Sequence, residues 1–172
     1  MAKNKTDAKP GGAAADQTIA IFDTKKVYLK DVSFEAPSTP VIFTRTDVKP
    51  AFDIQTGVTY TLIDENLGIY DIVLKVTVTT KHEDIVLYLA EIHQAGVFQI
   101  QHSDTDKRQT VIEVTCPHIL LPFAREELNS LITKGGFSAF LLPPVNFGAL
   151  FRKKQELAIA QTAAAEVTDK PN

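Results

Sequence analysis

The side chains that most often carry out chemistry are few in this sequence, and they form no catalytic or metal-binding pattern. Cys116 stands shortly before His118, and a Cys–His pair can act as nucleophile and base, but a cysteine at a helix junction is more often a small buried apolar residue. Glu126 and Glu127 are adjacent on a predicted helix, so their carboxylates diverge by about 100° and cannot form a close acid–base pair. No histidine stands in an HExxH motif or a similar helical spacing that directs two imidazoles at one metal; the histidines are His82, His93, His102 and His118. We therefore expect no enzyme activity, no metal and no cofactor.

Acidic residues on two predicted strands are more informative. Strand alternation places Asp31 and Glu35 on one face of the first strand, and it places Leu89, Glu91 and His93 on one face of a later strand. If these two strands are neighbours, the residues form an acidic patch with an apolar centre. The alternative, which the pattern supports equally, is that these acids only solvate the outer side of a sheet.

The composition excludes several classes of protein. The chain has 172 residues, 18 Lys plus Arg against 21 Asp plus Glu, a net charge of −3 and a pI of about 5.8, so a nucleic acid is not an expected partner. The apolar runs 85–90 and 119–121 are far shorter than the roughly 20 residues that cross a bilayer, so we expect no direct membrane insertion. A single cysteine and an N-terminal segment without an apolar signal region favour a cytoplasmic location.

The elements that must position these residues follow from hydrophobic periodicity. Alternation predicts a strand at 27–35, with Tyr28, Val32 and Phe34 on one face, and a long strand at 69–80. Residues 85–100 are apolar on both faces, which indicates a strand covered on both sides or at a subunit interface. Residues 51–55 are a weaker candidate for a short strand, and residues 41–43 are expected to be briefly extended.

The second half of the chain predicts helices. A short helix is expected from Asp104 onward, interrupted by Pro117, which lacks an amide hydrogen. A second helix runs to Lys134 and should bend at Pro122, and Asn146 is a suitable N-cap for a terminal helix from 147 to about 164. Strands first and helices second favour an α+β fold, with helices on one face of an antiparallel sheet.

The chain is expected to divide into one domain and two tails. Residues 1–18 lack aromatic residues and periodicity and are predicted to be a disordered N-terminal tail, residues 19–161 form the domain, and residues 162–172 form a flexible C-terminal tail. The domain carries many aromatic side chains for one small sheet. Surplus apolar surface of this kind usually marks an oligomer interface or a binding groove.

Four ordered motifs resemble the SecB family of protein-export chaperones. They are VYLKDVSFEAP at 27–37, YLAEIHQAGVF at 88–98, CPHILLPFARE at 116–126 and PVNFGALF at 144–151. The resemblance implies a four-stranded antiparallel sheet of Greek-key order with two main helices packed on one face, assembled as a homotetramer that is a dimer of dimers. It also implies an ATP-independent holdase that binds unfolded precursor proteins in hydrophobic grooves and delivers them to SecA.

The resemblance also assigns candidate site residues. Positions that match the SecA-docking surface of the family are Asp31, Glu35, Leu89 and Glu91. Apolar side chains in loops and at strand ends are the candidates for the client groove: Phe34, Phe43, Phe137, Phe140 and Leu142. The C-terminal segment and the whole chain are less acidic than is usual in the family, so docking should depend mainly on the three acids of the first set. An alternative function is that of a SecB-like chaperone that controls a toxin–antitoxin system.

Overall fold

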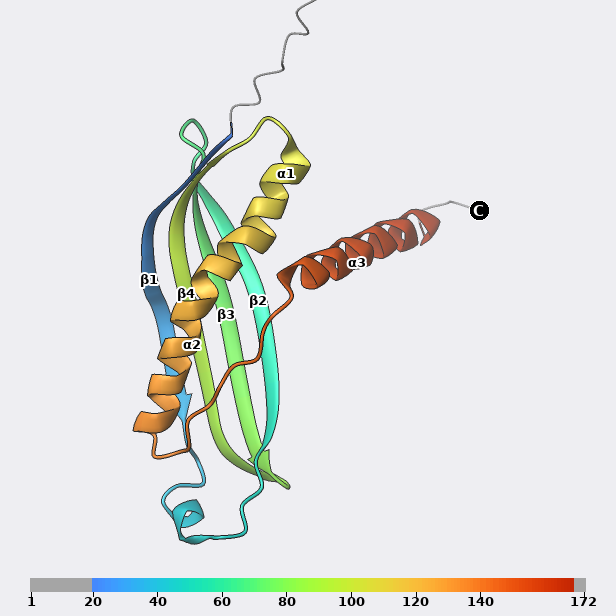
Figure 1. Cartoon of the computed structure of the whole chain (residues 1–172). Helices are drawn as coiled ribbons and strands as arrows, with labels where there is room; N and C mark the ends of the chain where they lie inside the picture. Colours follow the sequence, from blue (N-terminus) through green and yellow to red (C-terminus); the bar gives the residue numbers. More distant parts are fainter. Residues whose placement is uncertain (1–19, 169–172) are drawn as a thin grey trace, which may run out of the picture.

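The computed structural model describes residues 20–168, with side chains for residues 20–161. Its centre is one antiparallel sheet of four strands: β1 (Ile21–Glu35), β2 (Ala51–Asp64), β3 (Ile69–His82) and β4 (Ile85–Gln101). The strand order is β1-β4-β3-β2, so the long connection from β1 to β2 joins the two edges of the sheet (Figure 1). The α+β class is confirmed, and the predicted N-terminal tail lies outside the described residues.

Residue alternation on β3 and β4 gives the sheet two different faces. On β3, Tyr70, Ile72 and Leu74 are buried under the helices, whereas Asp71 and Lys75 point to the opposite side. We call these the helix face and the open face. The regular alternation of apolar and polar residues along β3 produces this division, because side chains of successive residues leave a strand on opposite sides.

A β-bulge in β1 corrects one sequence prediction. Opposed residues of antiparallel strands share a face, and Tyr28 opposes Ala95 while Asp31 opposes His93, so Tyr28 lies on the open face. The register shifts between Leu29 and Asp31, which places the extra residue Lys30 in the bulge. Tyr28 therefore does not share a face with Val32 and Phe34, as simple alternation predicted. 

The strands predicted at 69–80 and 85–100 are confirmed, whereas the predictions at 51–55 and 41–43 were too short and wrong in type, respectively. β2 extends to Asp64, because it pairs with β3 along its whole length although its own sequence alternates weakly. Residues 41–43 are not extended: they belong to the 3₁₀ helix η1 (Val41–Thr44). The amide of Phe43 donates to Pro40 O at 3.1 Å, so these backbone groups bond locally rather than to a strand.

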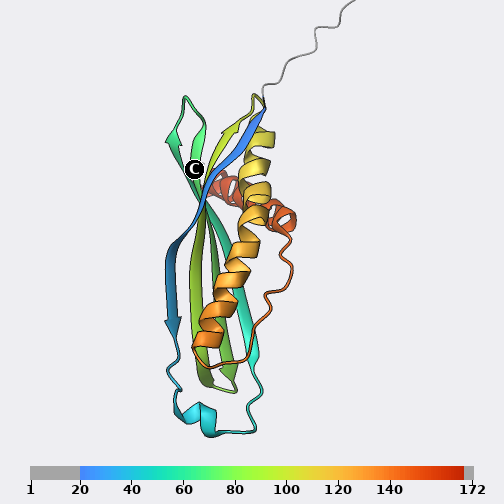
Figure 2. The same cartoon turned by 60° about the vertical axis from the view of Figure 1, so that its left-hand side comes forward.

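One continuous helical rod covers the helix face (Figures 1 and 2). It consists of α1 (Thr105–Thr110), the π-helical turn η2 (Val111–Thr115) and α2 (Cys116–Lys134). The expected interruption at Pro117 is therefore wrong. The Cys116 amide donates to the carbonyl of Val111, five residues earlier, and this wider turn immediately precedes the proline whose amide hydrogen is missing. Pro122 lies inside α2.

The terminal helix α3 (Phe147–Thr168) does not lie along the sheet, so only one of the two main helices occupies the helix face as expected. Asn146 Oδ1 accepts a hydrogen bond from the Ala149 amide at 2.9 Å, which confirms the predicted N-cap. Phe147 is buried, but Leu157 and Ile159 farther along are exposed, so the helix has no continuous apolar stripe packed on the sheet and projects away (Figure 1). α3 runs beyond the expected boundary at 162, and residues 169–172 of the predicted tail lie outside the described residues.

Candidate functional site

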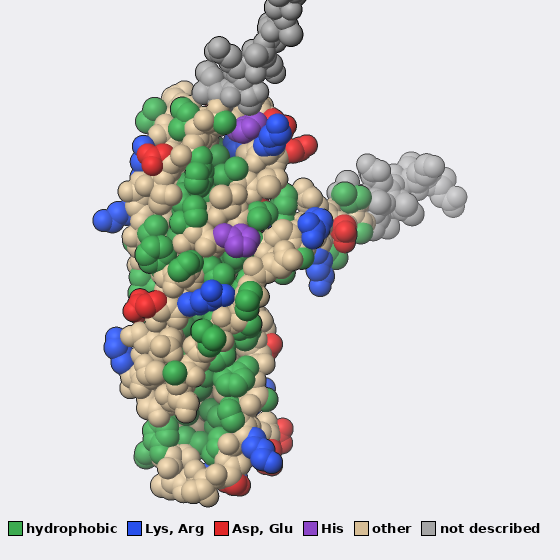
Figure 3. Space-filling view, viewed as in Figure 1, with side chains coloured by type: hydrophobic (Ala, Val, Ile, Leu, Met, Phe, Trp, Pro, Cys, Tyr) green, Lys and Arg blue, Asp and Glu red, His purple; other side chains and the backbone are tan. Residues whose placement is uncertain are grey.

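An apolar cavity of about 340 Å³ opens at the end of the sheet where η1 lies. Four separate segments form it: η1 with the loop after it, the start of β2, the hairpin end of β3 and β4, and the loop after α2. We call it the aromatic groove. Its apolar lining consists of Ile42, Phe43, Val48, Pro50, Phe52, Leu87, Tyr88, Phe137 and Ala139. Figure 3 shows hydrophobic side chains along this side of the molecule, where charged side chains are few.

Phe137 organises the aromatic groove through ring contacts with three other segments. Its ring centroid lies 4.8 Å from that of Tyr88, 5.2 Å from that of Phe43 and 6.5 Å from that of Phe34. The loop that carries Phe137 leaves α2 through Gly136, whose φ of +88° favours glycine. A Cβ at this position would stand 3.0 Å from the Phe43 ring, so glycine also permits the close approach of η1.

The loop between η1 and β2 is fixed at the rim of the groove by polar contacts. The Lys49 amide donates to His82 Nδ1 at 3.2 Å, and Arg45 Nη2 lies 2.8 Å from Asp47 Oδ2. The Arg45 guanidinium lowers the pKa of the Asp47 carboxyl. His82 therefore serves to hold a loop in place, which sequence reasoning did not anticipate.

The structure places the predicted groove residues unequally. Phe43 and Phe137 line the cavity. Phe34 does not line it but stacks on Tyr88, and Phe140 packs in a tilted arrangement on Phe52 with ring centroids 5.1 Å apart. Leu142 does not line it: the side chain is 2% exposed in the core, and its carbonyl accepts a hydrogen bond from Arg125 Nε. The groove is also lined by residues that were not predicted to be there, namely Phe52, Tyr88, Val48 and Leu87. Both aromatics belonged to the surplus that indicated a groove.

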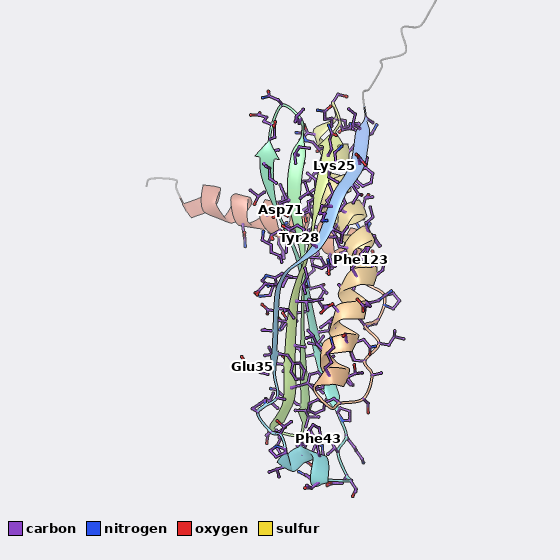
Figure 4. The ribbon with its side chains drawn as sticks, turned by 90° about the vertical axis from the view of Figure 1, so that its left-hand side faces the viewer. Lys25, Tyr28, Glu35, Phe43, Asp71 and Phe123 are labelled. Atoms are coloured by element: carbon purple, nitrogen blue, oxygen red, sulfur yellow. The ribbon has the colours of Figure 1, made fainter. Side chains whose placement is uncertain are left out.

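The four predicted docking residues come together on the open face. β1 and β4 are neighbours, with Glu35 opposite Leu89, Ser33 opposite Glu91 and Asp31 opposite His93. The sequence predicted that these residues come together if the two strands are neighbours, and the structure shows that the strands are neighbours. Figure 4 shows Glu35 near the end of β1 that leads toward Phe43.

The acids of this patch differ in how far the protein itself neutralises them. Glu91 accepts hydrogen bonds from Lys75 Nζ at 2.8 Å and Thr77 Oγ1 at 2.9 Å, and His93 Nε2 lies 3.1 Å from its carboxylate. The ammonium of Lys75 holds the pKa of Glu91 below its usual value. Asp31 has only the imidazole of His93 at 3.9 Å and is 66% exposed, and Glu35 makes no side-chain hydrogen bond or ion pair with any described residue.

A second polar cluster lies farther along the open face (Figure 4). Asp71 accepts hydrogen bonds from Tyr28 Oη at 2.9 Å and from Lys30 Nζ at 2.6 Å. The Lys30 contact comes from the bulge in β1, so the bulge turns both donors toward the same carboxylate. Burial and the neighbouring Asp71 raise the pKa of the Tyr28 hydroxyl.

The remaining candidates for chemistry have structural roles. Cys116 is fully buried, as expected, and burial raises the pKa of its thiol to about 12. His118 Nδ1 lies 2.7 Å from the Val114 carbonyl and its ring packs against Phe147. Among the described residues, no three His, Cys, Asp or Glu side chains cluster as metal ligands would. Within the same part of the chain, no helix combines the length and apolar character needed to cross a membrane.

Comparison with known proteins gives a consistent result. The family described as "Preprotein translocase subunit SecB" matches residues 15–158. A protein-export protein SecB of Halorhodospira halophila is 40% identical over 156 residues, which cover 91% of this chain and 88% of the relative. The corresponding protein of Nitrosococcus oceani is 42% identical over 149 residues, covering 86% and 89%.

One solved structure has a similar fold at low sequence identity. It is a SecB-like chaperone of Mycobacterium tuberculosis in complex with an antitoxin peptide, with a TM-score of 0.61 and 10% identity over 72% of this chain and 90% of that one.

Proposed function

Since this chain belongs to the SecB family of protein-export chaperones, which are not enzymes, we propose that it is an ATP-independent holdase. In this proposal it binds unfolded precursor proteins in the cytoplasm, keeps them competent for translocation and delivers them to SecA. The observation that carries the proposal is the aromatic groove, an apolar cavity left open on the surface of the chain. The Greek-key order and the dimer of dimers are parts of the same proposal, and the strand order β1-β4-β3-β2 supports the first.

The aromatic groove suits a client without fixed structure. Phe43 is 51% exposed and Phe52 is 48% exposed, so both rings offer apolar surface that a bound chain would remove from water. Burial of apolar surface contributes roughly 25 cal/mol per Å² and demands little directional geometry. A groove of aromatic rings therefore accepts many apolar segments with modest affinity each, and several grooves in one assembly add avidity.

The open-face patch is our proposed SecA-docking surface. Asp31 and Glu35 present carboxylates to solvent beside Leu89, on a separate face from the aromatic groove. A basic segment with an apolar side chain complements this arrangement. Because client and motor would bind opposite faces, the chaperone can hold both at once.

Two groove substitutions test the holdase. The Phe43→Ser/Phe137→Ser variant should bind an unfolded, reduced client about 10-fold more weakly, because aromatic anchors dominate such contacts. The measurement is client affinity together with suppression of client aggregation without ATP. Phe123→Ser is the matched control, since Phe123 is 49% exposed on α2 outside the groove. Native mass is measured for every variant, and unchanged client binding by the double variant would remove these residues from the site.

A second candidate function is control of a toxin–antitoxin system. The similar solved structure is of a chaperone that holds an antitoxin peptide, and a groove that accepts apolar segments could hold one. The relatives at about 40% identity are protein-export proteins, which favours export. A toxin–antitoxin pair encoded beside this gene would favour the second function.

A further inference from the structure

A basic residue of the chain itself, Lys75, lies at the centre of the proposed docking surface. Lys75 lies on β3 directly opposite His93 of β4, and its ammonium reaches across to Glu91 at 2.8 Å. The patch that is to attract a basic partner therefore has one of its three carboxylates already paired with a cation of the same chain.

Both oxygens of the Glu91 carboxylate contact other side chains of the chain. Oε1 receives Lys75 and His93, and Oε2 accepts from Thr77. Glu91 is 25% exposed and so held more firmly by these contacts than a free surface acid. A Lys or Arg of a partner that pairs with Oε1 must displace the Lys75 ammonium, which is 48% exposed on a flexible stem and can move into water.

We propose that Lys75 is an internal competitor for the partner: it occupies Glu91 in the free chaperone, and a basic segment of SecA must exchange with it on docking. The inference rests on the proposed function, because it assumes docking through this surface. Exchange of one ion pair for another gains little net free energy, so Lys75 keeps the complex weak and readily reversible. Asp31 and Glu35 then supply most of the attraction, since neither is held by a cation at hydrogen-bond distance.

The test compares two lysines of the same strand and face. Lys75→Met keeps the apolar stem and removes the competing charge, and we expect purified SecA to bind the full-length chaperone about 3- to 10-fold more tightly, with a steeper loss of affinity as salt is added. Lys81→Met removes the same charge from the open face of β3 but lies opposite Ala51, away from Glu91, and should change affinity much less. Lys75→Gln provides a second neutral variant, and the native mass and unfolding curve of each are measured.

A charge-reversed chaperone separates failure of this inference from failure of the proposed function. The Asp31→Lys/Glu35→Lys variant should lose SecA binding while client capture remains. If that variant loses SecA binding but Lys75→Met behaves like Lys81→Met, the competitor role of Lys75 is wrong and the docking surface stands. If the reversed variant binds SecA normally, the docking surface itself is wrong and the role of Lys75 falls with it.

Discussion

Cys116 illustrates how environment decides what a residue can do. The thiol sits at the start of α2 without exposed surface, and its raised pKa of about 12 keeps it protonated at neutral pH. The thiolate is the nucleophilic form of cysteine, so a buried thiol of this kind is inert although a histidine stands two positions later. At the residue scale, the prediction that Cys116 is a buried apolar residue is confirmed, and an isolated Cys–His pair without an orienting third group is weak support for catalysis.

Alkylation of Cys116 should therefore report on unfolding. We expect iodoacetamide at pH 8 to modify the native chain on the order of 100-fold more slowly than the urea-unfolded chain, as measured by mass spectrometry. Because folding raises the pKa of the thiol, its contribution to the free energy of unfolding should be fully present below the unfolded pKa of about 8.5. This contribution should fall as pH rises above that value, where only the thiol of the unfolded chain ionises. Native labelling at the unfolded rate would show that α2 does not bury this thiol.

At the scale of the element, the sequence predicted strongly periodic segments well and pairing-dependent details poorly. β3 alternates cleanly, and the strand predicted there is confirmed. The bulge at Lys30 depends on the register of β1 against β4, which lies far away in the chain, so local alternation could not reveal that Tyr28 changes face. The effect of Pro117 depends on η2 before it, because the π turn ends there and leaves the proline in the first turn of α2, where a missing amide hydrogen is tolerated.

The two surfaces differ in predictability for the same reason. Asp31 and Glu91 could be placed together from alternation and the expectation that their strands are neighbours. The aromatic groove is built from four segments that meet only in three dimensions. Nothing in the sequence near Phe52 and Tyr88 indicates whether their rings lie in a groove or in the core. Leu142 lies in a loop, as a groove residue was expected to, but its side chain is buried.

An ion pair between a buried carboxylate and an exposed lysine links α3 to η2. Glu113 of η2 is 5% exposed, and its Oε1 lies 2.5 Å from Lys154 Nζ of α3 and 3.3 Å from Gln109 Nε2. Removal of one partner leaves a buried carboxylate without its cation, which is more costly than removal of both charges. The attachment of α3 to the domain thus combines this ion pair with the packing of Phe147 in the core.

Lys154→Met should lower the free energy of unfolding by about 1–2 kcal/mol, less than for a fully buried pair because the lysine is 59% exposed. Amide exchange in α3 should become faster, because the helix loses one of its attachments to the domain. The Glu113→Gln/Lys154→Met variant should recover part of the loss, since the amide carries no charge to be buried. Urea unfolding and hydrogen exchange measure both effects, and additive losses in the double variant would show that the pair is not coupled.

Over the whole molecule, apolar side chains are exposed on an edge strand of the sheet, where a single chain would leave them in contact with water. The edge strand β1 carries Ile21, Phe22, Leu29 and Val32, all more than one-third exposed, and β1 has an unpaired edge. Exposed apolar edge strands invite pairing with another chain. This arrangement supports the proposed assembly, in which β1 edges of two protomers join and two such dimers associate.

Charge on the β1 edge should therefore disrupt assembly before it disrupts the fold. We expect the unaltered chain to sediment at four times its mass of 18.9 kDa and Val32→Lys, 40% exposed on β1, to shift toward smaller species. Leu62→Lys is the matched control, because Leu62 is 44% exposed on β2 at the other edge of the sheet. Smaller assemblies have fewer grooves and should capture a long client more weakly, although each groove is intact. A chain that sediments as a monomer, or a Val32→Lys variant that stays tetrameric, would contradict assembly through β1.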